Sequence, residues 1–337
     1  MPVQIEGREV SFGVWYDFRN PPQWQRPAAE LYARTLEHIE YAERLGFESI
    51  WTSEHHFIED GYSPSLLPIC AAIAARTTRA RIGTNVLLLP FHDPLRIAED
   101  AATVDIISNG RFDLGVAVGY KLEEFHGFGI DRKSRAGRME EAVQVIRKAW
   151  GAGSFSFEGR YYTYRDVDVT PKPVQDPMPL WMGGFSEPAV RRAARVADGL
   201  LAAANVIPTY MDELEKQGKA GAPPRIAISL PWALVAEDPD AAWSEIGEHI
   251  LYQRQNYARW FSAAGTPIFG GPPGSLEELR ERSPDIVVTP ERAEGIVRRI
   301  VSQHPVTHLY WWGIPPGMNP KATYRSMELF SRHVIGL

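Results

Sequence analysis

The residues best suited to chemistry stand together in the stretch TSEHHFIED, residues 52 to 60, where Glu54, His55 and His56 are adjacent. Imidazole changes its charge near neutral pH and also binds metals, so it suits either proton transfer or metal coordination. A histidine can equally satisfy hydrogen bonds at a buried strand end. The local sequence leaves all three roles open.

The expected geometry of this stretch disfavours a metal site built from both histidines. If residues 49 to 56 form a strand, alternate side chains face opposite sides. Glu54 and His56 then share one side, while His55 faces the other. We therefore expect no metal ligands here, and proton transfer and a structural role remain open for His55.

A second stretch with chemical potential is GGFSEPAVRRAA, which begins at Gly183. Two glycines and a serine directly before a predicted helix offer backbone N–H groups and the positive helix end to an anion. The same pattern is a common turn between a strand and a helix. The residues alone are compatible with either interpretation.

A repeating scaffold is predicted to position these segments. Short β-branched and aromatic runs alternate with longer amphipathic stretches, which is the pattern of strand–helix units around a parallel sheet. The eight predicted strands begin at Val10, Ser49, Ala80, Arg111, Pro179, Gly199, Arg225 and His308. This pattern favours the α/β class and a (β/α)8 TIM barrel over an open doubly wound sheet. The active site should lie at the C-terminal strand ends, where SEHH, GYKLEEF and GGFSEP fall.

Two segments interrupt the repeat. Residues 154–179 alternate aromatic and polar side chains and then become proline-rich, which predicts a hairpin excursion before the fifth strand. Residues 257–285 cluster glycine and proline, which predicts a lid insertion before the eighth strand. We expect residues 1–337 to form a single domain.

Composition excludes several classes of protein. The chain has 337 residues and a net charge of -6, which gives no field to attract nucleic acid. Its single cysteine, Cys70, cannot form an internal disulfide and suits a reducing compartment. The N-terminus has no signal-peptide pattern, and no run reaches the roughly 20 apolar residues that span a bilayer. We expect a cytoplasmic protein that binds neither nucleic acid nor membrane.

Several long stretches resemble one known superfamily. They are GFESIWTSEHHF, IGTNVLLLPFHDPLRIAEDAATVDIISNGRFDLGVAVGY, FGIDRKSRAGRMEEAVQVI and PLWMGGFSEPAVRRAARVADG. Together with RNPPQW and the C-terminal PPGMNPKATYRSMELF, they occur in the order found in the bacterial luciferase-like monooxygenase superfamily. Members of this superfamily are barrels that use a flavin or a deazaflavin.

The resemblance implies a specific set of site residues. The catalytic residue is His55, which matches the histidine near the reactive edge of the flavin ring. The implied cofactor contacts are Asn85, Val86, Val118, Arg135, Gly184, Phe185 and Ser186.

Three details of that set follow from the resemblance. The bond between Asn85 and Val86 matches a non-proline cis peptide beside the ring. The loop from Gly184 to Ser186 and the guanidinium of Arg135 match groups that hold the flavin phosphate. Val118 replaces another phosphate-contacting arginine of bacterial luciferase, so the head group depends on Arg135 and the loop, or sits differently.

The resemblance also implies a function. We expect a two-component monooxygenase that uses O₂ and reduced FMN, supplied by a separate flavin reductase, to oxygenate a small organic substrate. The lack of a G-x-G-x-x-G fingerprint after a strand agrees with a separate reductase. The alternatives are a deazaflavin-dependent hydride-transfer oxidoreductase and a non-catalytic flavin-binding protein. Relatives commonly form homodimers, here through residues 65–77 and 94–108.

Overall fold

The strands and helices follow the predicted alternation closely in a computed structural model of the chain, which describes residues 2–219, 224–266 and 270–336. The strands are β1 (Val3–Ile5), β2 (Arg8–Tyr16), β3 (Ser49–Thr52), β4 (Arg81–Thr84), β5 (Leu87–Leu88), β6 (Phe112–Ala117), β7 (Phe155–Glu158), β8 (Thr163–Val167), β9 (Leu180–Gly183), β10 (Gly199–Ala202), β11 (Arg225–Ser229), β12 (Leu234–Val235), β13 (Val287–Val288) and β14 (His308–Trp312). The helices are α1 (Ala28–Arg44), α2 (Leu66–Arg76), α3 (Pro94–Ser108), α4 (Leu122–Gly127), α5 (Arg135–Trp150), α6 (Glu187–Val196), α7 (Ile207–Lys216), α8 (Pro239–Ala263), α9 (Leu276–Arg282), α10 (Pro290–Gln303) and α11 (Tyr324–Phe330).

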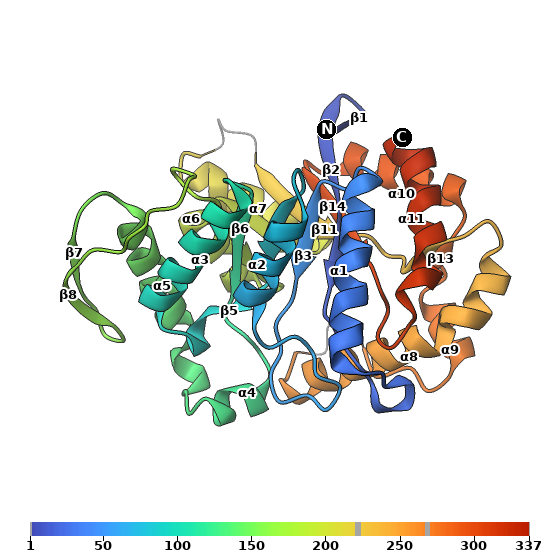
Figure 1. Cartoon of the computed structure of the whole chain (residues 1–337), viewed down its shortest axis with the longest axis horizontal. Helices are drawn as coiled ribbons and strands as arrows, with labels where there is room; N and C mark the ends of the chain where they lie inside the picture. The colour runs from blue at the N-terminus through green and yellow to red at the C-terminus, as the bar shows by residue number, and fades with distance from the viewer. Residues whose placement is uncertain (1, 220–223, 267–269, 337) are drawn as a thin grey trace. The chain divides into compact units, whose positions relative to one another are not determined.

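The fold is a (β/α)8 TIM barrel of the α/β class, as predicted. Its eight strands are β2, β3, β4, β6, β9, β10, β11 and β14, and each overlaps one of the eight predicted runs. At least one helix follows each strand along the chain (Figure 1). The chain divides into two compact units, Met1–Trp51 with Ile58–Ser63 and Ile226–Leu337, and Thr52–Phe57 with Pro64–Arg225.

The first unit is built around β2 and β14, which pair in parallel from Ser11 opposite His308 to Trp15 opposite Trp312. β11 pairs with the other edge of β14, and β1 adds a short antiparallel hairpin to β2. Helix α11 packs Phe330 edge-on against Phe12 of β2, with 5.1 Å between the ring centroids. Aromatic side chains therefore dominate this core, as the composition of these strands favours.

The second unit contains the parallel strands β4, β6, β9 and β10, with β5 also paired to β6. Helices α2, α3 and α5 lie side by side next to these strands (Figure 1). β4 and β6 approach closely at Gly115, whose N–H and carbonyl both bond to the Thr84 hydroxyl. A Cβ atom at Gly115 would lie 1.9 Å from the Thr84 carbonyl oxygen, so only glycine fits there.

The two predicted interruptions have different outcomes. The hairpin excursion is confirmed, because β7 and β8 pair antiparallel within residues 154–179 and extend beyond α5 (Figure 1). The predicted lid, residues 257–285, contains the end of α8 and the short helix α9. Residues 267–269 of that segment lie outside the described residues, and its action as a lid stays a prediction.

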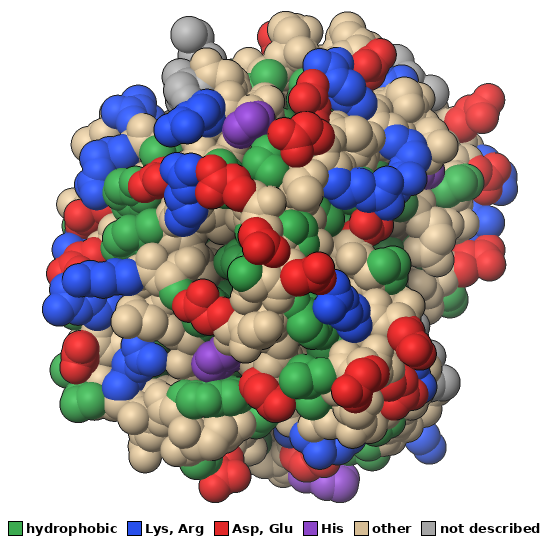
Figure 2. Space-filling view, turned by 90° about the vertical axis from the view of Figure 1, so that its right-hand side faces the viewer, with side chains coloured by type: hydrophobic (Ala, Val, Ile, Leu, Met, Phe, Trp, Pro, Cys, Tyr) green, Lys and Arg blue, Asp and Glu red, His purple; other side chains and the backbone are tan. Residues whose placement is uncertain are grey.

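On the face drawn in Figure 2, Lys and Arg side chains are interspersed with Asp and Glu over most of the visible surface. Within the described residues, every helix is too short or too polar to cross a bilayer.

Candidate active site

The segment that carries His55 is a loop and not the end of a strand. The strand predicted through His56 is too long, because β3 ends at Thr52. The Thr52 carbonyl accepts a 2.6 Å hydrogen bond from the Asn85 N–H, which fixes the start of this loop. The predicted separation of side chains still holds, since His56 contacts Glu54 whereas His55 contacts different groups. This separation of the two histidine side chains is produced by hydrogen bonds and not by the alternation of a strand.

His55 is held between an acid and a phenol. Its Nδ1 lies 2.7 Å from Oε1 of Glu124, and its Nε2 lies 3.2 Å from the hydroxyl of Tyr120. The Glu124 side chain is completely buried, and the same oxygen accepts the His56 backbone N–H at 2.9 Å. An ionised carboxylate can only accept, so Nδ1 of His55 donates and Nε2 is left for proton exchange. This arrangement is typical of a general acid or base.

The contacts of His55 with Glu124 and Tyr120 were not predicted from the sequence, although GYKLEEF was placed at a strand end. The short helix α4 contains a sequence signal that could have identified Glu124. Glu123 is 62% exposed at the side chain, whereas Glu124 lies on the buried side of the same turn, next to Phe125. Helical spacing could separate the two acids only if this short helix had been recognised.

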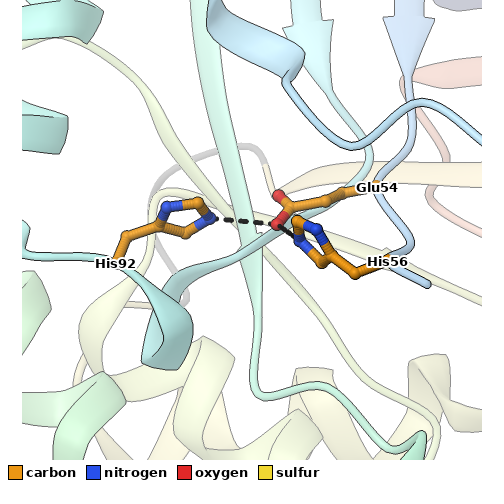
Figure 3. Close-up of side chains that lie close together, drawn as sticks. All are labelled: Glu54, His56 and His92. Atoms are coloured by element: carbon orange, nitrogen blue, oxygen red, sulfur yellow. Dashed lines mark hydrogen bonds and ion pairs between the residues drawn. The ribbon is translucent and has the colours of Figure 1, made fainter. Parts of the chain in front are cut away.

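A second network surrounds Glu54 (Figure 3). Its Oε1 lies 2.5 Å from Nε2 of His56 and 2.9 Å from Nε2 of His92, and its Oε2 accepts the Leu88 N–H at 3.0 Å. Burial alone would raise the pKa of Glu54, but the two imidazoles outweigh it and lower that pKa to about 2. The carboxylate is therefore ionised at neutral pH. His92 follows β5, and the sequence reasoning missed it.

Asn85 and Val86 lie at the break between β4 and β5, and the bond between them is cis, as the resemblance implied. Val86 packs against Gly183 of β9, where a Cβ atom would come within 2.9 Å of the valine side chain. Nδ2 of Asn85 is buried and has no hydrogen-bond partner among the described residues. A buried donor of this kind is costly unless a ligand accepts from it.

The predicted phosphate loop leads into α6. Ser186 precedes the first residue of α6, and its side chain makes no capping hydrogen bond to that helix. Gly184 and Phe185 precede it, and Phe185 is 48% exposed. The first N–H groups of α6 thus lie at an accessible loop, as an anion site requires.

Arg135 is the first residue of α5 and belongs to a group of cationic side chains. Its Nη1 donates a 2.7 Å hydrogen bond to the Arg132 carbonyl. Burial, and then the charges of Arg132 and Arg192, lower the pKa of Arg135. Arg192 lies on α6 and forms an ion pair with Glu140 at 2.6 Å. Repulsion among three guanidinium groups favours a bound anion.

The predicted residues all lie within the second unit. Contacts link the His55 loop to Asn85 through Thr52, and Val86 to the strand that carries the phosphate loop. Val118 follows β6 and is half-buried, and its place among the cofactor contacts stays a prediction. The unsatisfied amide of Asn85 and the cationic group around Arg135 fit a cofactor with polar ring edges and a phosphate.

Comparison with known proteins identifies relatives of this architecture. A family model described as luciferase-like monooxygenase matches residues 10–283. The oxygenase component of a flavin-dependent trigonelline monooxygenase from Acinetobacter baylyi is 33% identical over 161 residues, which cover 47% of this chain and 44% of that protein. An F420-dependent glucose-6-phosphate dehydrogenase from Amycolatopsis mediterranei is 33% identical over 195 residues, which cover 56% and 58%.

A solved structure matches almost the whole chain. The monooxygenase RslO1 from Streptomyces bottropensis superposes with a TM-score of 0.83 and 25% sequence identity, covering 97% of this chain and 99% of that one. In contrast, the chain spans about half the length of the curated relatives it matches. By their names, these relatives include both flavin-dependent and F420-dependent proteins.

Proposed function

Since the chain belongs to the luciferase-like monooxygenase family, we propose that it is the oxygenase component of a two-component flavin-dependent monooxygenase. It would take reduced FMN from a separate reductase and use O₂ to oxygenate a small organic substrate. The observation that carries the proposal is His55, held by the buried Glu124 in the same compact unit as Asn85 and its unsatisfied amide.

The chain's own residues handle the proton and the cofactor. When bound, reduced FMN supplies the electrons that activate O₂. Glu124 accepts a hydrogen bond from Nδ1 of His55 and orients the ring, so that Nε2 can take up and return a proton. The Tyr120 hydroxyl, 3.2 Å from Nε2, orients that nitrogen.

The anchoring groups are Asn85, Arg135 and the loop from Gly184 to Ser186. The free amide hydrogen of Asn85 offers a hydrogen bond to an acceptor on the ring edge. The guanidinium of Arg135 and the N–H groups at the start of α6 would bind the phosphate. Val118 contributes a half-buried apolar side chain after β6.

A second candidate is deazaflavin-dependent hydride transfer between F420 and an organic substrate. It is supported by the similarity to F420-dependent glucose-6-phosphate dehydrogenase and by the cationic group around Arg135, which could hold an acidic cofactor tail. A non-catalytic flavin-binding protein is less well supported, since binding alone would not require the Glu124–His55 pair.

We also infer a homodimer through α2 and α3, as the resemblance implied. Ile106 and Ile107 of α3 are 39% and 46% exposed, and a partner subunit would cover such apolar side chains. Light scattering at several protein concentrations measures this directly. A monomer at all concentrations would contradict it.

The test of the proposed reaction is reconstitution. The purified chain is supplied with FMN, NADH and a generic flavin reductase, and aldehydes, ketones and aromatics are screened for oxygenated products by mass spectrometry under ¹⁸O₂. We expect incorporation of one labelled oxygen with the native chain and its loss in His55→Ala. Substrate-dependent reduction of F420 without O₂, and no labelled product, would favour the second candidate.

A further inference from the structure

We propose that Glu54, His56 and His92 form a binding site for one divalent transition-metal ion of the zinc type. The site is separate from the proposed cofactor contacts and does not depend on the proposed function. One ligand atom of each residue lies within 4.8 Å of the others, and both histidines direct a ring nitrogen toward Oε1 of Glu54 (Figure 3).

The donor set has the chemistry of a metal site. Two imidazole nitrogens and one carboxylate oxygen are ligands that zinc and neighbouring first-row ions prefer. Three protein ligands leave one position of a tetrahedron for water or another small ligand. Calcium and magnesium are disfavoured, because they select oxygen ligands.

The distances allow an ion with little movement. The two imidazole nitrogens lie 2.5 Å and 2.9 Å from Oε1 of Glu54, as hydrogen-bonded groups do. Ligands about 2.1 Å from a tetrahedral zinc ion are about 3.4 Å apart, so each ring must withdraw by less than about 1 Å. Binding would replace the two shared protons by the metal.

The surrounding residues hold the ligands in place. The Leu88 N–H binds the second oxygen of Glu54 at 3.0 Å, which orients the carboxylate as outer-shell groups do in metal sites. The His56 ring contacts Phe128 edge-on, with 4.7 Å between centroids, and Phe91 at 6.1 Å. The two phenylalanines stack on each other at 4.9 Å. These contacts restrict rotation of the His56 ring.

The three ligands differ in exposure to solvent, which suits an ion that can exchange. The Glu54 side chain is 1% exposed and the His56 side chain is 9% exposed, so both ligands are shielded from bulk solvent. The His92 side chain is 27% exposed, which leaves a route for the ion from solvent. A buried carboxylate needs compensation for its charge, and a divalent cation provides it.

The first experiment measures binding by the full chain. Protein stripped with a chelator is titrated with Zn²⁺ in competition with a chromophoric chelator. We expect one equivalent to bind, and His56→Gln or His92→Gln to weaken binding by more than about 100-fold, since changes to outer-shell groups alone cost roughly 10- to 100-fold. His126→Gln, an exposed histidine of α4, is the matched control and should bind as the native chain does.

A second variant distinguishes the loss of a metal ligand from misfolding of the chain. In His92→Cys, a thiolate can replace the imidazole as ligand, and Co²⁺ should then show a thiolate charge-transfer band that the native chain lacks. The proposal is overturned if the native chain binds no Zn²⁺, or if the glutamine variants bind it equally well. A folded His92→Cys variant that binds Co²⁺ without the thiolate band would overturn it as well.

Discussion

His55 depends on a neighbour that is 69 positions away in the chain. Its Nδ1 contact with Glu124 gives the ring a defined tautomer, and a single histidine in a sequence does not reveal such a contact. His55 could be identified from the sequence because TSEHHF is a continuous motif. The contacts of His55 with Glu124 and Tyr120, and of Glu54 with His92, could not be identified, because only the fold brings these residues to the motif.

We expect His55→Ala to lower the turnover number by about 100-fold or more, because loss of a general acid or base has that effect. FMN affinity should stay nearly unchanged, since the imidazole is not among the proposed phosphate or amide anchors. Steady-state turnover and an FMN fluorescence titration measure the two quantities. A variant that turns over normally would show that His55 is structural.

Glu124→Gln keeps the shape of the side chain but removes the charge that holds the proton on Nδ1. We expect reduced turnover, because an amide can offer its NH2 group to Nδ1 and then no longer fixes which ring nitrogen of His55 donates. Glu123→Gln, the exposed neighbour on the same turn, is the matched control. Reduced turnover together with a lower free energy of unfolding in urea for Glu124→Gln would indicate an effect on packing alone.

His38 provides a test of stability against pH. It is buried between the Tyr16 hydroxyl and the Thr323 hydroxyl, and burial lowers its pKa to about 3. Below about pH 6.5 the unfolded chain therefore binds a proton that the folded chain does not bind. The contribution of His38 to the free energy of unfolding is complete above about pH 6.5. It is lost as the pH falls toward 3, at up to about 1.4 kcal/mol per pH unit.

Urea unfolding of the native chain and His38→Gln at pH 7 and pH 5 measures this effect. The native chain should lose more free energy of unfolding between the two pH values than the variant does. His126→Gln, an exposed histidine, should behave as the native chain. Equal losses in the native chain and in His38→Gln would mean that His38 is protonated in the folded state.

At the scale of elements, the sequence predicts strands better than it predicts their ends. The run from Ser49 continues with Glu54 and the two histidines, and nothing in these residue types marks a stop at Thr52. Side-chain hydrogen bonds to Glu54 and Glu124, made by loop residues, compete successfully with further strand pairing. The hairpin β1–β2 was missed for a similar reason, since its three-residue strand β1 carries little periodicity.

The starts of α5 and α6 together provide the proposed anion site. For Arg135→Ala we expect FMN affinity to fall by about 10- to 100-fold, which corresponds to the roughly 1.5–3 kcal/mol of a hydrogen bond to a charged group. Riboflavin affinity should not change, because riboflavin lacks the phosphate. Equilibrium titrations with both ligands provide the comparison.

Lys133→Ala is the matched control for Arg135→Ala. Lys133 is exposed and two positions away, so its removal changes the local charge by the same amount without removing the proposed contact. Only a small, salt-dependent loss is expected. Equal losses of FMN and riboflavin affinity in Arg135→Ala would show that the arginine supports folding instead.

For the whole molecule, binding of the correct cofactor should appear as added stability. A ligand present at about 100 times its dissociation constant stabilises the folded state by roughly 2.7 kcal/mol. Because about 1 kcal/mol shifts the melting temperature of a large chain by roughly 2 °C, a rise of several degrees is expected with FMN. Riboflavin should raise the melting temperature by less, since the anion site around Arg135 and Ser186 then stays unoccupied.

Thermal unfolding scans with FMN, riboflavin and F420 at matched concentrations rank the three ligands. A larger rise in melting temperature with F420 than with FMN would favour hydride transfer. The ligand that binds the folded state most tightly is expected to be the one that fits both the ring contact at Asn85 and the anion site.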